Sequence, residues 1–309
     1  MTMKIIKILF GLLLVSIFLV ACNSEQKYSF ENVKNEKIDH VHGLGYANGG
    51  NEFLVATHNG LYQFDKKSWK VANSQKHDYM GFAAVRDGFY SSGHPEEGSN
   101  LKNPLGLIKS TGKGANMEQL AFYGELDFHY LAVGYDNNTI YVFNETPTDN
   151  LEGGLHYSTD EGKTWTKVAL NGFNSSSISN FAAHPSKEGI LVIGSKDGIY
   201  LSKDYGENFS ELIFNEMVTY VTLIENGGIY STIDDIQQVY LKLFTLESKE
   251  VKDIKLPKEI KNDPIINLAV NPNEHQEITI VTNNLSIYQT KDQGDSWYSL
   301  AVHGNLVLE

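Results

Sequence analysis

The sequence predicts an all-β fold, a six-bladed β-propeller, from a recurring motif and a recurring strand pattern. The motif reads STDEGKTW from Ser158, SKDYGENF from Ser202 and TKDQGDSW from Thr290, so the copies start 44 and then 88 residues apart. Because 88 is twice 44, the spacing points to a structural repeat. Apolar runs of strand length alternate with polar turns, and no long segment has helical periodicity.

Weaker copies of the motif fill the remaining positions. FDKKSW starts at Phe64, STGKGANM at Ser110 and a degenerate TLESKEVK at Thr245. The first residues therefore fall near positions 64, 110, 158, 202, 246 and 290, at intervals of 44 to 48 residues. One four-stranded propeller blade has this length. Six blades account for residues 38 to 303, and we assign 38–309 to the propeller.

Each blade is predicted from apolar segments in a fixed order. HGLGY, GFAAV, YLAVG, NFAAH and NLAVN are the expected innermost strands, and FLVATHNGLYQF and ILVIGSKDGIYLS each contain the next two strands with a short turn between them. A blade cannot bury both faces alone, so neighbours in a ring must cover them. Either terminus, residues 27–30 or 304–309, could supply a strand that closes the ring.

The recurring acid, glycine and aromatic residue are predicted to be structural. They lie between the third and fourth strands of a blade, where a short acidic side chain can accept hydrogen bonds from turn amides. Glycine permits the positive φ that such a turn often needs, and the aromatic ring can pack on the blade. We call these segments the acidic turns. Their predicted residues are Asp160, Gly162, Trp165, Asp204, Gly206, Asp292, Gly294 and Trp297, with Trp69 in the same slot of the first blade.

These turns resemble the Asp-box, or BNR, repeat of sialidase-type and sortilin-type propellers. The segments DHVHGLGY, SSGHP, NPLGLIKSTGKG and LDFHYLA also resemble a bacterial lipoprotein subgroup labelled glycosyl-hydrolase-like. Over residues 38–303 the resemblance implies a six-bladed β-propeller with Asp-box turns, which lie away from the functional face. It does not fix an activity, because the label describes shape.

The N-terminus predicts export and lipidation. Residues 1–21 are interpreted as a lipoprotein signal peptide, with Lys4 and Lys7 before an apolar run and LVAC at its end, which resembles a lipobox. Cys22, the only cysteine, is then the residue expected to carry palmitate; an ordinary secretory signal with an incidental cysteine is the alternative. Residues 22–37 are polar and predicted to be a lipidated tether. The expected location is the extracytoplasmic face of a bacterial cell membrane.

Charge and composition exclude two function classes. The formal net charge is −13, so the chain should repel phosphate backbones, and nucleic acid is not an expected partner. Arg86 is the only arginine. The sialidase family grips its substrate carboxylate with three arginines, so classical sialidase activity is not expected.

Five histidines are predicted to share one end of the ring. His40, His42 and His129 precede first strands, whereas His58 and His94 follow second strands, and these turns open on the same face of a propeller. Asp39, Asp78 and Asp127 lie at the same strand entrances. Three interpretations stay open: a divalent transition metal bound by residues such as His40, His42 and His129, a polar floor for a glycan, peptide or protein, and histidines paired with backbone and no ligand.

A binding or assembly module that uses this face of blades 1 to 3 is the leading functional prediction. Two long insertions, residues 94–104 and 144–154, fall on the same face and favour recognition. The alternative is a glycoside hydrolase acting on extracellular or cell-wall glycan. Its weak catalytic candidates are Asp127, Asp39 and Glu145, and with 38 acidic residues in the chain a carboxylate pair has little diagnostic value.

Overall fold

The computed structural model describes residues 27–308 apart from 35, 51 and 66. The predicted signal peptide and Cys22 lie outside these residues. Within the described part the only helix is a three-residue 3-10 segment, η1 (Gly112–Gly114), and every other element is a strand. No helix in that part is long and apolar enough to cross a membrane.

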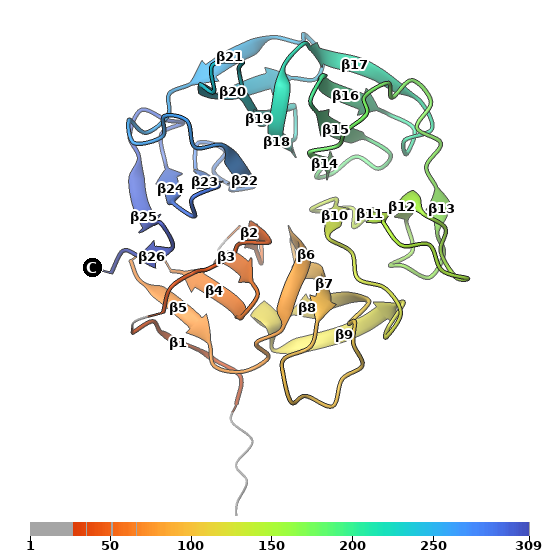
Figure 1. The fold of residues 1–309 in the computed structure, drawn as a ribbon, viewed down its shortest axis with the longest axis vertical. Helices are drawn as coiled ribbons and strands as arrows, with labels where there is room; N and C mark the ends of the chain where they lie inside the picture. The colour runs from red at the N-terminus through yellow and green to blue at the C-terminus, as the bar shows by residue number, and fades with distance from the viewer. Residues whose placement is uncertain (1–26, 35, 51, 66, 309) are drawn as a thin grey trace, which may run out of the picture.

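The strands form six small antiparallel sheets arranged as the blades of a ring (Figure 1). Blade 1 contains β1 (Phe30–Asn32), β2 (Gly43–Ala47), β3 (Glu52–Thr57), β4 (Gly60–Phe64) and β5 (Trp69–Ala72). Blade 2 contains β6 (Asp78–Val85), β7 (Gly88–His94), β8 (Leu107–Thr111) and β9 (Asn116–Ala121). Blade 3 contains β10 (Tyr130–Val133), β11 (Ile140–Asn144), β12 (Gly154–Ser158) and β13 (Thr166–Lys167).

The second half of the chain repeats this arrangement. Blade 4 contains β14 (Asn180–Ala183), β15 (Leu191–Ser195), β16 (Gly198–Ser202) and β17 (Phe209–Phe214). Blade 5 contains β18 (Met217–Ile224), β19 (Gly227–Ile233), β20 (Val239–Thr245) and β21 (Val251–Ile254). Blade 6 contains β22 (Ile265–Val270), β23 (Ile278–Thr282), β24 (Ile287–Thr290), β25 (Tyr298–Val302) and β26 (Asn305–Leu306). The prediction of a six-bladed β-propeller is confirmed.

The apolar core is divided among the junctions between blades. Each of the six buried clusters in the described residues joins two neighbouring blades, as Leu54 and Phe89 do between blades 1 and 2. The cluster between blades 6 and 1 includes Ala301 and the fully buried Trp69. Apolar packing therefore closes the ring, since each sheet buries its faces against the next.

The strand at the N-terminus does not join the sheet of blade 6, and the strand at the C-terminus does not join the sheet of blade 1. β1 pairs with β5 at the outer edge of blade 1, and β26 pairs with β25 at the outer edge of blade 6. A single bridge, Lys37 with Asn305, links the two ends, together with a hydrogen bond from Ile38 N to Gly304 O of 2.9 Å. β1 also places three residues of the predicted tether in the propeller, because their backbone satisfies the free edge of β5.

The acidic turns have one repeated hydrogen-bond pattern. Asp160 accepts hydrogen bonds from the backbone N–H of Thr164 at 2.9 Å, from Thr164 Oγ1 at 2.7 Å and from Ser158 Oγ at 2.8 Å. Gly162 has φ +83°, and its N–H donates to Ser158 Oγ at 2.9 Å. Asp204 and Asp292 make the corresponding contacts in blades 4 and 6.

The aromatic residues of these turns pack differently from one blade to the next. Trp69 is 1% exposed, whereas Trp165 and Trp297 are half-buried. Each indole N–H donates to a backbone carbonyl, of Leu300, Gly162 and Lys255 respectively. The predicted structural role therefore has a physical basis: the motif satisfies its own turn, and the indoles of Trp69 and Trp297 also donate to carbonyls outside that turn.

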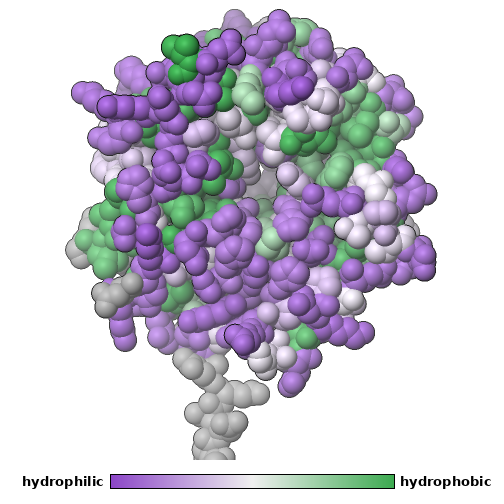
Figure 2. Space-filling view, in the orientation of Figure 1, coloured by the Kyte–Doolittle hydropathy of each residue, from purple (hydrophilic) through white to green (hydrophobic). Residues whose placement is uncertain are grey.

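A cavity of about 380 Å³ lies along the ring axis. The innermost strands β2, β6, β10, β14, β18 and β22 line it. Figure 2 shows the corresponding hollow at the centre of a mainly hydrophilic face. Arg86 lies at the end of the cavity formed by the turns between first and second strands, where its Nε contacts Asp136 Oδ1 at 2.6 Å. The single arginine is thus committed to an ion pair away from the five predicted site histidines.

Candidate functional site

The five predicted site histidines all occupy the same end of blades 1 to 3. His40 and His42 immediately precede β2, and His58 lies in the turn between β3 and β4. His94 ends β7 and His129 immediately precedes β10. In each of these blades the first strand begins, and the second strand ends, at this face. The two insertions 94–104 and 144–154 follow β7 and β11 here, as the sequence predicts. We call this surface the histidine-rich face.

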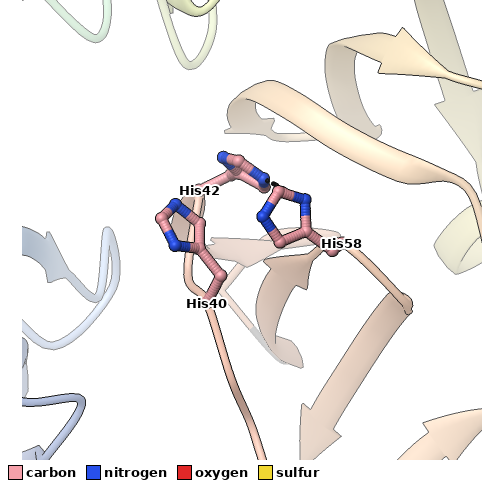
Figure 3. Close-up of side chains that lie close together, drawn as sticks. All are labelled: His40, His42 and His58. Carbon is pink, nitrogen blue, oxygen red and sulfur yellow. Dashed lines mark hydrogen bonds between the residues drawn. The ribbon is translucent and has the colours of Figure 1, made fainter.

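Three imidazoles of blade 1 converge (Figure 3). Each of His40, His42 and His58 has one ring nitrogen that lies within 4.8 Å of a ring nitrogen of both other residues. His42 Nε2 is 3.1 Å from His58 Nδ1, and the His40 ring lies with its centroid 4.5 Å from that of His42. We call this group, with Asp78, the blade 1 cluster.

Asp78 completes the cluster from the neighbouring blade. Its Oδ1 is 3.0 Å from His42 Nε2, and its Oδ2 is 2.9 Å from His58 Nδ1. Asp78 begins β6, so the packing of blade 2 on blade 1 brings the carboxylate to the imidazoles.

Burial and the neighbouring side chains favour neutral imidazole at His40 and ionised carboxylate at Asp78. Partial burial, with the neighbouring His42 and His58, lowers the pKa of His40 below its ordinary value. Burial alone would raise the pKa of Asp78, but the adjacent imidazoles of His42 and His58, 3.0 and 2.9 Å from its oxygens, outweigh it and lower that pKa. Neutral imidazole and ionised carboxylate are the forms that bind metal ions and accept hydrogen bonds.

Local structure holds the blade 1 side chains in place. The backbone N–H of His42 donates to Ala56 O at 2.9 Å, which extends the β2–β3 pairing to this residue. His58 follows Thr57, whose Oγ1 donates to Gly60 O at 2.9 Å and accepts from Asn59 N at 3.1 Å. Gly60 has φ +101°, which favours glycine and closes the two-residue turn. The buried Val41 anchors the segment between His40 and His42.

A second group, the blade 3 cluster, lies around Asp127. His94 Nε2 is 3.5 Å and His129 Nε2 is 3.8 Å from Asp127 Oδ2, and His129 Nδ1 is 3.0 Å from Glu145 Oε2. His94 Nδ1 is also 2.6 Å from Asn103 Oδ1, in the insertion that follows it. Asp78 and His94 are register partners in the β6–β7 pair, so blade 2 contributes one residue to each cluster.

The structure groups the predicted site residues into clusters that differ from the grouping predicted from the sequence. His40 and His42 meet His58, whereas His129, the third metal ligand suggested by the sequence, contacts Asp127 and Glu145. Asp39 is exposed, and its charge acts on the ring of His40. Asp78, which the sequence places only at a strand entrance, takes the central position in the blade 1 cluster. No sequence signal separates it from the other acidic residues.

Three further histidines are buried in structural roles. His184 Nδ1 accepts hydrogen bonds from the backbone N–H groups of Ser186 and Lys187, and its Nε2 lies 3.0 Å from Glu225 O. His77 Nδ1 accepts the N–H of Glu96, at the base of the 94–104 insertion. His156 contacts the carbonyl of Gly154. None of these side chains belongs to the two clusters.

Comparisons with known proteins identify the fold and nothing finer. No protein-family model and no curated protein sequence matches the chain. Among solved structures, TolB from Acinetobacter baumannii superposes with a TM-score of 0.56 at 11% identity, covering 84% of this chain and 61% of that one. Oligogalacturonate lyase from Vibrio parahaemolyticus has a TM-score of 0.52 at 11% identity, covering 91% and 89%.

A GH74 xyloglucanase from Xanthomonas campestris is also similar, with a TM-score of 0.55 at 16% identity. The alignment covers 89% of this chain but 47% of the xyloglucanase, so the chain spans about half the length of that enzyme. At these identities the likeness is one of architecture. Propellers of this shape include both binding proteins and enzymes, and the side chains of the site must decide between them.

Proposed function

We propose that the protein is a lipid-anchored binding module on the extracytoplasmic side of a bacterial membrane, which takes a glycan ligand at its histidine-rich face. The observation that carries this proposal is the meeting of five histidines with Asp78, Asp127 and Glu145 at one end of blades 1 to 3. These residues come from six separate chain segments. The hydrogen bonds that Asp160, Asp204 and Asp292 accept in the acidic turns come, by contrast, from their own segments.

The chemistry of the face suits a saccharide. Imidazoles and carboxylates offer both donors and acceptors for hydroxyl groups, and His129 and Glu145 are exposed. Tyr130, next to His129, is 38% exposed and offers a ring on which a sugar can pack. Two of the structural relatives are named for saccharide substrates, xyloglucan and oligogalacturonate, which supports this class of ligand.

A glycoside hydrolase is the second candidate, favoured by the contact of two carboxylates, those of Asp127 and Glu145, with the same imidazole of His129. Such enzymes need two carboxyl groups about 5 Å or about 6.5–9.5 Å apart, with the sugar between them. Here the imidazole of His129 contacts both carboxylates, by Nε2 and Nδ1, and so stands between them. Binding without cleavage is therefore the function that this geometry supports better.

The test measures binding and turnover on the same samples. The probes are soluble muropeptides and plant cell-wall oligosaccharides, titrated calorimetrically into the detergent-solubilised full chain and then analysed by chromatography for cleavage. We expect a saccharide to bind uncleaved, and the double variant His94→Ala/His129→Ala to weaken that binding about tenfold or more. Lys203→Ala, in an acidic turn of blade 4, is the matched control and should bind normally.

Three results would count against the proposal. Cleavage abolished by Asp127→Asn would establish the hydrolase instead. Equal binding by wild type and by His94→Ala/His129→Ala would move the ligand off this face. The absence of binding to any probe would remove glycans as the ligand class.

A further inference from the structure

We infer that His40, His42, His58 and Asp78 form a binding site for one divalent transition-metal ion. The inference rests on the proposed function, which makes the histidine-rich face the binding face, and assigns a metal ion to the blade 1 half of it. The blade 3 cluster is not part of this site. Figure 3 shows the three imidazoles turned toward one another at the entrance of blade 1.

The spacing of the ligand atoms fits a small metal ion. His42 Nε2, His58 Nδ1 and the two Asp78 oxygens are joined by distances of 3.1, 3.0 and 2.9 Å. Four ligands at about 2.0–2.1 Å from a tetrahedral Zn²⁺ stand about 3.3 Å from one another. The His40 nitrogen lies within 4.8 Å of the other two, so a rotation of this exposed side chain can bring it to the same ion.

Hydrogen bonds alone satisfy these atoms poorly. Two ring nitrogens 3.1 Å apart can share only one proton, and if both donate to Asp78 their N–H groups face each other. Asp78 Oδ1 is buried and accepts no hydrogen bond of good geometry from the described residues, although His42 Nε2 is 3.0 Å away. A cation at the centre would satisfy the lone pairs of both imidazoles and the carboxylate together.

The donor set indicates which ions can bind. Three imidazoles and one carboxylate suit Zn²⁺ and Cu²⁺, whereas Mg²⁺ and Ca²⁺ prefer sites made of oxygen ligands. His42 is held by backbone pairing and the turn around His58 by Thr57, so two ligands are placed in advance. His40 and His58 are exposed, which leaves a path for the ion to enter from solvent.

The blade junction is central to this site. Three ligands come from blade 1 and one from blade 2, so a bound ion would tie the start of β6 to the β3–β4 turn. A metal that binds only the folded ring must also raise its thermal stability. This linkage gives a readout that does not depend on any activity.

The experiment uses the full chain in detergent, treated with EDTA and then titrated with Zn²⁺. We expect one ion per chain by elemental analysis and a rise in melting temperature with added Zn²⁺. When Co²⁺ replaces Zn²⁺, we expect the visible absorption spectrum of a Co²⁺ ion in a site of low symmetry. His58→Ala and Asp78→Asn should each weaken binding by at least about 100-fold, beyond the 10- to 100-fold typical of outer-shell residues. His58 lies in an exposed turn, so its replacement should leave the fold intact.

The double variant His94→Ala/His129→Ala is the matched control and should bind Zn²⁺ as the wild type does. Failure of the wild type to bind Zn²⁺, Cu²⁺ or Co²⁺ would overturn the inference, as would equal affinities in His58→Ala and wild type. Affinity lost in the control rather than in His58→Ala would place the ion in the other cluster and also overturn it. The proposed function fails separately, through the saccharide titration, which does not require the metal.

Discussion

Replacing Trp69 should weaken the closure of the ring more than replacing any equivalent tryptophan. Trp69 begins the fourth main strand of blade 1, is 1% exposed, and packs in the cluster that joins blade 1 to blade 6. Its Nε1 donates to Leu300 O of blade 6 at 2.8 Å, across the junction between the two ends of the chain. Trp297 occupies the same slot in blade 6 and donates to Lys255 O at 2.8 Å, but it is half-buried.

The expected cost of Trp69→Phe combines two effects. Loss of the indole hydrogen bond costs about 1 kcal/mol, because Leu300 O still accepts a bond from Val307 N. Loss of the second ring leaves a small void that costs about 1 kcal/mol more. The sum, about 2 kcal/mol, corresponds to a fall in melting temperature of about 3–4 °C for a domain of this size, since the entropy of unfolding is about 2.1 cal/mol/K per residue. Trp69→Ala should cost about 3–5 kcal/mol.

The assay is differential scanning calorimetry together with guanidinium denaturation followed by circular dichroism. Tryptophan fluorescence is unsuitable because the variants change the chromophore. Trp297→Phe is the matched control and should cost about 1 kcal/mol or less, because solvent can replace its hydrogen bond. If Trp297→Phe proves as destabilising as Trp69→Phe, the junction between blades 6 and 1 is not held by the buried indole and the reasoning fails.

Three further predictions concern pH and the membrane. Hydrogen bonds from Thr164 lower the pKa of Asp160 from 3.8 to about 2, so the contribution of this carboxylate to stability is fully present above about pH 4 and is lost as the pH falls toward 2. Asp160→Asn should flatten that part of a plot of melting temperature against pH, and an unchanged plot would contradict this prediction. Burial lowers the pKa of His184, so its contribution to stability is present above about pH 6.5 and lost on acidification. His184→Asn should make the fall in melting temperature between about pH 6.5 and 5 shallower, and an unchanged slope would contradict this. Cys22→Ala should abolish incorporation of labelled palmitate and release the protein from the membrane fraction, whereas retained label would exclude Cys22 as the acyl acceptor.

Fold and turns could be predicted because their determinants are local. A blade needs about 44 residues, and the acid, glycine and hydroxyl residues that close the turn at Asp160 lie within seven positions of one another. The closure of the ring could not be predicted, since residues 27–30 and 304–309 both have strand character. The structure has a strand at each end, Phe30–Asn32 and Asn305–Leu306, at the outer edges of β5 and β25, but neither joins the blade at the other end of the chain.

The site could be predicted only to the level of one face. Strand order places His40, His42 and His129 at the same end of the ring, but it does not say how far apart two blades hold their side chains. In the structure the third imidazole is that of His58 and not that of His129. His58 is 16 residues from His42 in the sequence, and its Nδ1 lies 3.1 Å from His42 Nε2. Asp78 could not be chosen in advance, because its role depends on how blade 2 packs on blade 1.

The aspartates of the acidic turns and those of the histidine-rich face differ in how their carboxylates are used, and this difference argues for function at the histidine-rich face. In the acidic turns, Asp160 and Asp292 each accept hydrogen bonds from their own segment, so little of their acceptor capacity is left for a ligand. At the histidine-rich face, Asp78 and Asp127 instead meet imidazoles that belong to other blades or other strands. A titratable partner from a distant segment does little for local folding, since the unfolded chain must pay loop-closure entropy to bring it there. Contacts of this kind are expected where selection acts on binding, and the blade 1 cluster is the place where they are most concentrated.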